Sequence, residues 1–137
     1  MTANRRIPLL ERDAVSLLTR MGYDATVFST YFQRGSHFIP YNLIAYQKNS
    51  EGKEEHLWVK VKIAMHRLGS VQTATIFCHD EIQIMHRFFD SAPVALPLRY
   101  EVWVSLPTHE FQRFEITRDG FCELPAPVPT LSPGGVV

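Results

Sequence analysis

The stretch Ile39-Pro40-Tyr41-Asn42-Leu43-Ile44-Ala45-Tyr46 is followed, after the polar turn Lys48-Asn49-Ser50-Glu51-Gly52-Lys53, by Leu57-Trp58-Val59-Lys60-Val61-Lys62. Both flanking stretches are rich in β-branched and aromatic residues, and the turn between them contains glycine, a pattern that predicts two adjacent β-strands. Side chains alternate between the two faces of a strand, so one face of the second strand carries Trp58, Lys60 and Lys62. The other face carries Leu57, Val59, Val61 and Ile63.

Outward from this hairpin, the apolar spacing predicts an amphipathic helix over 9–21, opened by Pro8 and closed by Gly22. A β-branched and aromatic run predicts a strand over 25–31, and the hairpin strands are expected near 39–47 and 55–65. Val71–Phe77 is β-prone, and a second helix is expected over 80–90. Two further strands, 98–106 and 111–117, form the expected final hairpin.

Composition indicates one domain, over residues 1–123, because 137 residues with 45% apolar content can bury a core without disulfide or metal. Residues 124–137 are rich in proline and glycine and predict an extended tail.

Fourteen basic and fourteen acidic side chains cancel, so any DNA-binding surface must be a local patch. Cys78 and Cys122 lie in apolar sequence and are expected to be buried free thiols. Without a signal peptide or membrane span, a cytoplasmic location is expected.

The order of elements resembles the PD-(D/E)XK nuclease superfamily, in particular its archaeal Holliday-junction-resolvase branch. The resemblance implies an α/β fold, with a restriction-endonuclease-like αβββαβ core in which helices flank a mixed central sheet. In that family a helix glutamate, a strand aspartate and a strand glutamate bind Mg²⁺, and a nearby lysine supports the attacking water. Glu11 matches the helix glutamate and Lys62 the lysine, whereas Asn42 and Lys60 stand at the positions of the two strand carboxylates.

These substitutions imply a degenerate active site, because Mg²⁺ prefers anionic oxygen ligands and Lys60 is a cation. No metal is expected at these residues, and Glu11 could pair with Lys60 instead. A carboxylate that has moved into the site, from Asp24, Asp80 or Glu81, is the route by which activity could survive. The simpler interpretations are that Lys60 and Lys62 form a solvated strand face, and that Glu11 is favoured by the helix dipole.

A basic patch is the candidate nucleic-acid surface, with Tyr31, Tyr41 and Trp58 available for base stacking. Its members are Arg34, His37, Lys60, Lys62, His66 and Arg67. The alternative is that these aromatic residues belong to the core and the cations are dispersed. The histidines show no HxxxH or HExxH spacing, and the serines have no GxSxG context, so zinc and serine chemistry are not indicated.

The sequence therefore favours a non-catalytic nuclease-like domain that binds nucleic acid, with branched or duplex DNA preferred. A protein-interaction or scaffold subunit with the same fold is the first alternative, and a residual Mg²⁺-dependent endonuclease with migrated ligands is the second. No cofactor is expected unless nuclease activity survives. The resemblance also implies a homodimer, because a four-way junction offers two symmetric cleavage points.

Overall fold

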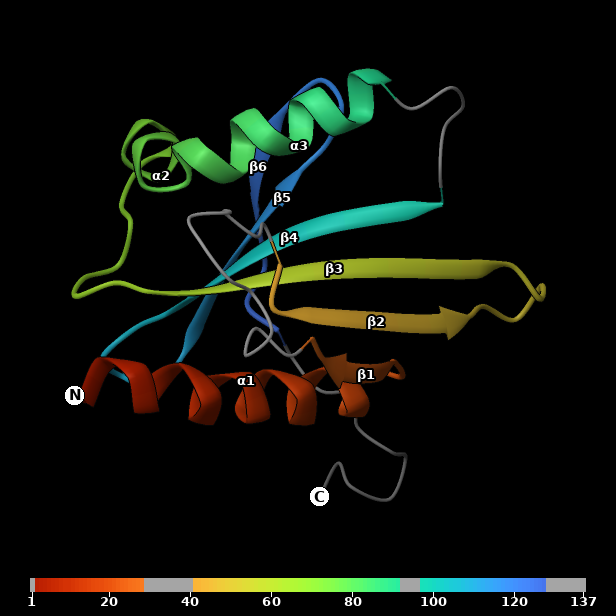
Figure 1. Ribbon diagram of the computed structural model, residues 1–137, viewed down its shortest axis with the longest axis horizontal. Coiled ribbons are helices and arrows are strands. Elements are labelled where there is room, and N and C mark those ends of the chain that lie inside the picture. The colour runs from red at the N-terminus through yellow and green to blue at the C-terminus, as the bar shows by residue number, and fades with distance from the viewer. Residues whose placement is uncertain (1, 29–40, 92–96, 128–137) are drawn as a thin grey trace.

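The computed structural model describes residues 2–28, 41–91 and 97–127, with side chains from residue 7 onward. Its centre is a six-stranded sheet in which the strands lie in sequence order (Figure 1). The strands are β1 (Asp24–Val27), β2 (Leu43–Lys48), β3 (Glu54–Ile63), β4 (Leu98–Ser105), β5 (Phe111–Ile116) and β6 (Phe121–Leu124). β3 and β4 are parallel, and all other neighbours are antiparallel.

Helices lie on both faces of this sheet. A parallel pair needs a crossover connection, which α2 (Val71–Phe77) and α3 (His79–Ser91) provide between β3 and β4. α1 (Thr2–Arg20) lies on the side of the sheet away from α3, as Figure 1 shows. The expected α/β class, with a mixed sheet flanked by helices, is confirmed, and the more specific nuclease-like core stays a prediction.

The alternation predicted for β3 is confirmed and explains its two-sided burial. Leu57, Val59 and Val61 are at most 2% exposed and pack in the core beneath α1. Trp58 packs on the opposite face, with the core beneath α2 and α3. The residues available for a site on β3 therefore project toward α2 and α3.

The first helix differs from the prediction at its start. It begins at Thr2, and Pro8 lies inside it. A proline inside a helix removes one main-chain hydrogen bond and strains the preceding turn, at a cost that the rest of the helix can offset. The end is as predicted: Gly22 has a left-handed φ of 98°, and Tyr23 N donates to Leu18 O at 2.9 Å.

Val71–Phe77, a β-prone run to which the sequence assigned no definite element, is helical. Ser70 caps this helix, because its hydroxyl oxygen accepts a hydrogen bond from Thr73 N at 3.1 Å. Local capping and the burial of Ala74 against the core therefore override the β propensity of the segment.

The other boundaries differ in smaller ways. β2 begins at Leu43, later than the expected 39, and β1 ends at Val27, while residues 29–31 of the expected first strand lie outside the described residues. β6 was not predicted, and Leu124, which the sequence assigned to the tail, pairs with Arg113. Among the described residues, no helix is long and apolar enough to cross a membrane.

Candidate functional site

Five polar residues form a buried or half-buried group at the start of β2, beside the second half of β3. We call this group the charge cluster. It consists of Glu11 from α1, Asn42 before β2, Lys60 and Lys62 on β3, and Glu81 in the first turn of α3. Glu11, Asn42 and Glu81 are 8%, 6% and 1% exposed, so each must find its partners inside the protein.

Asn42 extends the pairing of β2 with β3 by one residue. Its main-chain N donates to Val59 O at 2.7 Å, and its side-chain Oδ1 accepts from Val61 N at 2.6 Å. Its own main-chain carbonyl is thereby freed to accept from Phe28 N at 2.7 Å, which brings the end of β1 to this point. The amide oxygen of Asn42 is therefore used by the backbone of β3.

The side chain of Asn42 also donates a hydrogen bond to Glu11, which joins α1 to the sheet. Burial raises the pKa of Glu11 above 4.5, while this hydrogen bond and the charge of Lys60 act against the rise. Burial likewise lowers the pKa of Lys60, against the attraction of Glu81 and Glu11. The ammonium group of Lys60 thus experiences carboxylates from two different helices.

Lys62 connects β3 to the junction between α2 and α3. Its Nζ lies 3.1 Å from Glu81 Oε1, donates to Phe77 O at 2.7 Å, and stands 4.6 Å from the centroid of the Phe77 ring. Phe77 is the last residue of α2, where main-chain carbonyls lack partners and the helix dipole favours a cation. Glu81 lies in the first turn of α3, where the dipole favours an anion. The pair therefore stabilises both helix ends.

The structure places Glu11, Asn42, Lys60 and Lys62, the four residues that the resemblance selects, close together, and their role stays a prediction. Glu81 adds a second buried carboxylate to Glu11, the one that the resemblance selected. Glu81 was named as a possible migrated ligand, whereas the two others, Asp24 and Asp80, are exposed. Two lysines against two carboxylates leave the cluster without net charge.

This arrangement does not fit a Mg²⁺ ion. The oxygen of Asn42 is taken by Val61 N, and the carboxylate of Glu81 by Lys62. An ammonium group about 4 Å from Mg²⁺ would be repelled by roughly 8 kcal/mol at an effective dielectric constant near 20. Within 2–28, 41–91 and 97–127, no group of three or more His, Cys, Asp and Glu residues gathers as a metal site.

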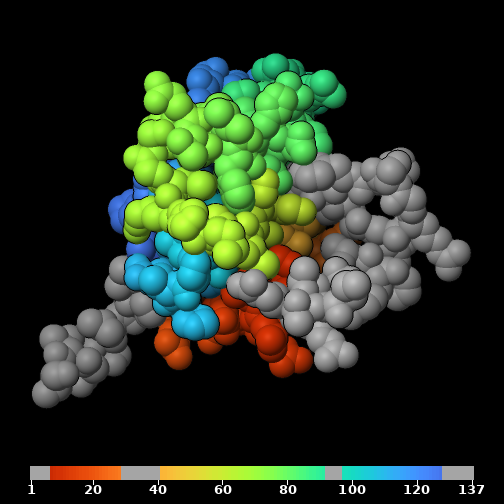
Figure 2. All heavy atoms as spheres, turned by 90° about the vertical axis from the view of Figure 1, so that its left-hand side faces the viewer, coloured from red at the N-terminus to blue at the C-terminus, as the bar shows by residue number. Residues whose placement is uncertain are grey.

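The predicted basic patch is only partly seen. Arg34 and His37 lie outside the described residues. His66 and Arg67 are exposed in the segment after β3, and Arg67 Nη1 lies 3.4 Å from Glu123 Oε2. A groove of about 300 Å³ runs beside them, lined by Met65, His66, Arg67, Leu106, Pro107, Thr108 and Glu110. Figure 2 shows this side of the molecule, where the yellow-green segment after β3 lies next to the blue turn between β4 and β5.

Of the aromatic residues named with this patch, Tyr41 and Trp58 belong to the part of the chain that the structure describes. Tyr31 is outside the described residues, but the rings of Tyr41 and Trp58 are in contact, with centroids 4.6 Å apart. Both rings pack at the margin of the core and are half-buried. Tyr41 and Trp58 therefore contribute to the core, as the alternative interpretation of these aromatic residues held, but each also keeps an accessible part.

The expectation for the cysteines is half correct. Both thiols are free, but only Cys78 is buried, and burial raises its pKa to about 12. Cys122 is exposed, because it lies on the edge strand β6, which the sequence did not reveal.

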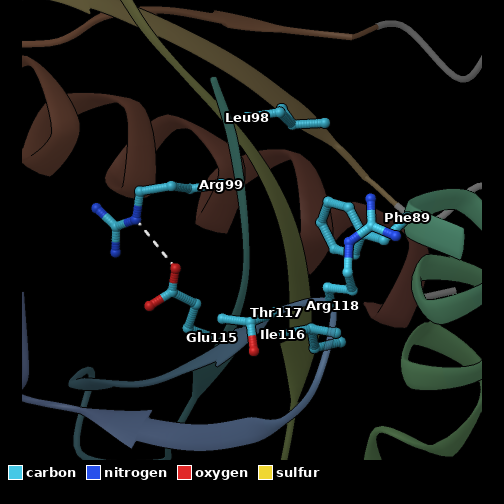
Figure 3. A pocket seen from close by; sticks show the side chains of 7 residues that line it. All are labelled: Phe89, Leu98, Arg99, Glu115, Ile116, Thr117 and Arg118. Carbon is cyan, nitrogen blue, oxygen red and sulfur yellow. Dashed lines mark hydrogen bonds and ion pairs between the residues drawn. The ribbon is translucent and has the colours of Figure 1, made fainter. Parts of the chain in front are cut away.

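A second polar network lies on the other sheet face, and sequence analysis missed it. Glu101 is fully buried and accepts hydrogen bonds from Arg99 Nη2 at 2.8 Å, Trp103 Nε1 at 2.8 Å and Arg113 Nε and Nη2 at 2.9 Å. Arg99 also donates to Glu55 at 3.2 Å and to Glu115 at 3.1 Å, and Figure 3 shows the Arg99 and Glu115 side chains turned toward each other. This network joins β3, β4 and β5 and is internally satisfied.

No family model, curated protein or solved structure matches this chain. The charge cluster therefore carries the argument about function, together with the surfaces beside it. It joins α1, β2, β3 and α3 through hydrogen bonds and ion pairs.

The titration of Glu11 gives a test of this geometry. A carboxyl group whose pKa is raised by folding contributes its full stabilisation when the pH is below the ordinary pKa of 4.5. That contribution is lost as the pH rises through the folded-state pKa. We expect the difference in unfolding free energy between wild type and Glu11→Gln to fall as the pH rises above 4.5. Urea unfolding at a series of pH values measures this difference, and a pH-independent or rising difference would contradict the burial of an ionisable Glu11.

Proposed function

We propose that the protein is a nuclease-like domain that binds branched or duplex DNA without cleaving it. The observation that carries this proposal is the charge cluster. Glu11, Asn42, Lys60 and Lys62 come together, and these are the four positions that the resemblance to PD-(D/E)XK nucleases selects. The order of one helix, three antiparallel strands, a helical crossover and a parallel strand further supports this proposal.

The absence of cleavage follows from the way the cluster is neutralised. Lys60 brings a positive charge between Glu11 and Glu81, so the protein supplies its own cation where the resembled enzymes bind a metal. The two lysines are committed to carboxylates inside the protein and are poorly placed to bind phosphate. Phosphate contacts are therefore assigned to exposed cations, of which Arg67 and His66 lie just beyond the end of β3.

A residual Mg²⁺-dependent nuclease is the weaker candidate, because the Glu81 carboxylate that could serve it is already paired with Lys62. A second buried carboxylate stands beside Lys62, at a position that the degenerate motif did not include. Incubation of labelled junction and duplex DNA with Mg²⁺ or Mn²⁺ separates the two candidates, because cleavage that is lost in Glu81→Gln would support the second. The resemblance further implies a homodimer, which light scattering on the purified protein tests.

DNA binding is expected to depend on both structure and salt. Anisotropy titrations compare a labelled four-way junction, a duplex and a single strand of the same length over a salt series. We expect tighter binding of the junction or duplex, and a logarithm of affinity that falls linearly with the logarithm of salt concentration. Failure to bind any of the three at low salt would reject the proposal and favour the interaction-subunit alternative.

The contribution of the exposed cations is tested by Arg67→Ala. We expect weaker binding to all DNA structures and a salt slope reduced by about one unit, which is the effect of losing one phosphate contact. Lys53→Ala is the matched control, because Lys53 is exposed in the turn before β3, at the opposite end of that strand. Equal slopes for wild type and Arg67→Ala would place the DNA away from the end of β3.

A further inference from the structure

One half of the sheet face that carries Trp58 is lined by aromatic rings. On this face α3 packs near β5 and α2 packs near β6, on the other half of the sheet. Toward β1 and β2, Phe28, Tyr41, Trp58 and Phe88 form a continuous row, with successive ring centroids 5.2, 4.6 and 5.4 Å apart. All four side chains are half-buried, so the row reaches the surface.

An open groove lies at the end of this row. It has a volume of about 320 Å³ and is lined by His56, Trp58, Phe88, Pro97 and Leu98. Two strands and one helix form it, because His56 and Trp58 come from β3, Leu98 from β4 and Phe88 from α3. The strand pairing fixes two of its lining residues relative to each other, because His56 is the direct partner of Leu98 in the parallel pair of β3 and β4.

The chemistry of the groove suits a planar ring. Three of its five lining residues are aromatic, and base stacking on such rings tolerates every sequence because every base has a π-face. Arg87, one residue before Phe88 on α3, is exposed and available for a phosphate contact. A nucleotide supplies a planar base for the aromatic lining and a phosphate for an exposed cation such as Arg87.

We infer that the groove beside Trp58 takes an unpaired nucleobase of a bound DNA strand. This inference rests on the proposed function and deepens it, because it assigns Trp58 as the stacking surface. Single-stranded segments and frayed ends offer such bases, so a stacking site would add a preference for open structures to the salt-dependent phosphate contacts.

The two tryptophans of the chain provide a direct readout. Trp58 is half-buried at the groove, whereas Trp103 is fully buried and donates its Nε1 hydrogen to Glu101 at 2.8 Å. We expect titration with a short oligothymidylate to quench tryptophan emission in the wild type and in Trp103→Phe. In Trp58→Phe, whose remaining indole is Trp103, the emission is expected to stay constant.

Affinity then separates stacking from a purely structural role. Trp58→Phe keeps an aromatic face and is expected to bind the oligonucleotide nearly as well as the wild type. Trp58→Leu keeps an apolar side chain without the ring, and is expected to bind about 5- to 150-fold more weakly, the range for losing one stacked base. Circular dichroism on each variant verifies that it is folded.

The failures of this inference and of the proposed function are distinguishable. If anisotropy shows DNA binding while the emission of Trp58 does not change and Trp58→Leu binds like the wild type, the groove is not a base site and the proposed function stands. If no DNA of any structure binds at low salt, both are rejected. Equal losses in Trp58→Phe and Trp58→Leu would show that Trp58 supports the sheet rather than a base, and would also overturn the inference.

Discussion

Replacement of Glu101 by glutamine is expected to lower the free energy of unfolding by about 3 kcal/mol, the lower end of the range for breaking a buried ion pair. Glu101 is 0% exposed, and its two oxygens accept hydrogen bonds from Arg99, Trp103 and Arg113. Glutamine retains one oxygen, but it presents an NH₂ group to a guanidinium and leaves positive charge uncompensated. The lower end applies because Arg99 is 33% exposed and keeps some hydration. Urea unfolding of both proteins measures the loss.

Glu115→Gln is the matched control for this change. Glu115 pairs with the same arginine at 3.1 Å but is 18% exposed and faces the pocket of Figure 3. Its loss is expected to cost less than about 1 kcal/mol, as for ion pairs that water can reach. Similar losses for the two variants would mean that the network acts as a surface feature rather than as a buried anchor between β4 and β5.

The parts of the fold that could be predicted from the sequence are those encoded by local periodicity. The alternation from Leu57 to Lys62 gave the correct two faces of β3, and the spacing of apolar residues gave α1 and α3. The differences occur where a local propensity meets a stronger constraint. Val71–Phe77 contains β-branched residues, but it forms a helix because Ser70 caps its first turn and Ala74 is buried in the core.

The site shows the same division between local and long-range information. Glu11, Asn42, Lys60 and Lys62 could be named from sequence because a family pattern selected them. Glu81 was named only as one of three carboxylates that could move into the site, although a more specific signal was present: with Met85 and Phe88 at spacings of four and seven, it stands on the apolar stripe of α3. A carboxylate on a buried helix face needs an internal partner, which is Lys62.

The Glu101 network had no comparable signal. Glu101 meets Arg113 only because β4 and β5 pair in one register, in which Trp103 lies opposite Arg113. Glu55 joins through the parallel pairing of β3 with β4, a contact between residues far apart in sequence. Such networks depend on the strand register, which alternation alone does not fix.

Asn42 has a structural reason that is independent of any ancestry. It must accept from Val61 N and donate to Glu11 at once, which an amide can do and a carboxylate cannot. An aspartate at this position would face the carboxylate of Glu11 across a buried contact. The neutral amide, the two lysines and the two carboxylates therefore form a mutually consistent set, and changing one member alters the requirements on the others.

This dependence makes the double change Asn42→Asp with Lys60→Glu the most informative one. It replaces a cation with an anion and an amide with a carboxylate, so the cluster has four carboxylates against the single ammonium of Lys62. A hard divalent cation is then the natural partner, because Mg²⁺ and Mn²⁺ favour several oxygen ligands. We expect the variant to be destabilised without metal and to bind Mn²⁺, which calorimetry measures directly. At a hundredfold excess of metal over its Kd, stabilisation of about 2.7 kcal/mol is expected from binding to the folded state alone.

Lys60→Gln is the control, because it removes the cation without adding a carboxylate and is expected to bind Mn²⁺ far more weakly than the double variant. DNA cleavage is a separate question, since a catalytic constellation must be held to within about half an ångström. Metal binding without cleavage would agree with a domain whose cluster replaced its metal by Lys60. A folded double variant that binds neither Mg²⁺ nor Mn²⁺ would show that Glu11, Glu81 and the substituted positions do not face a common point, and the comparison with a metal site would then fail.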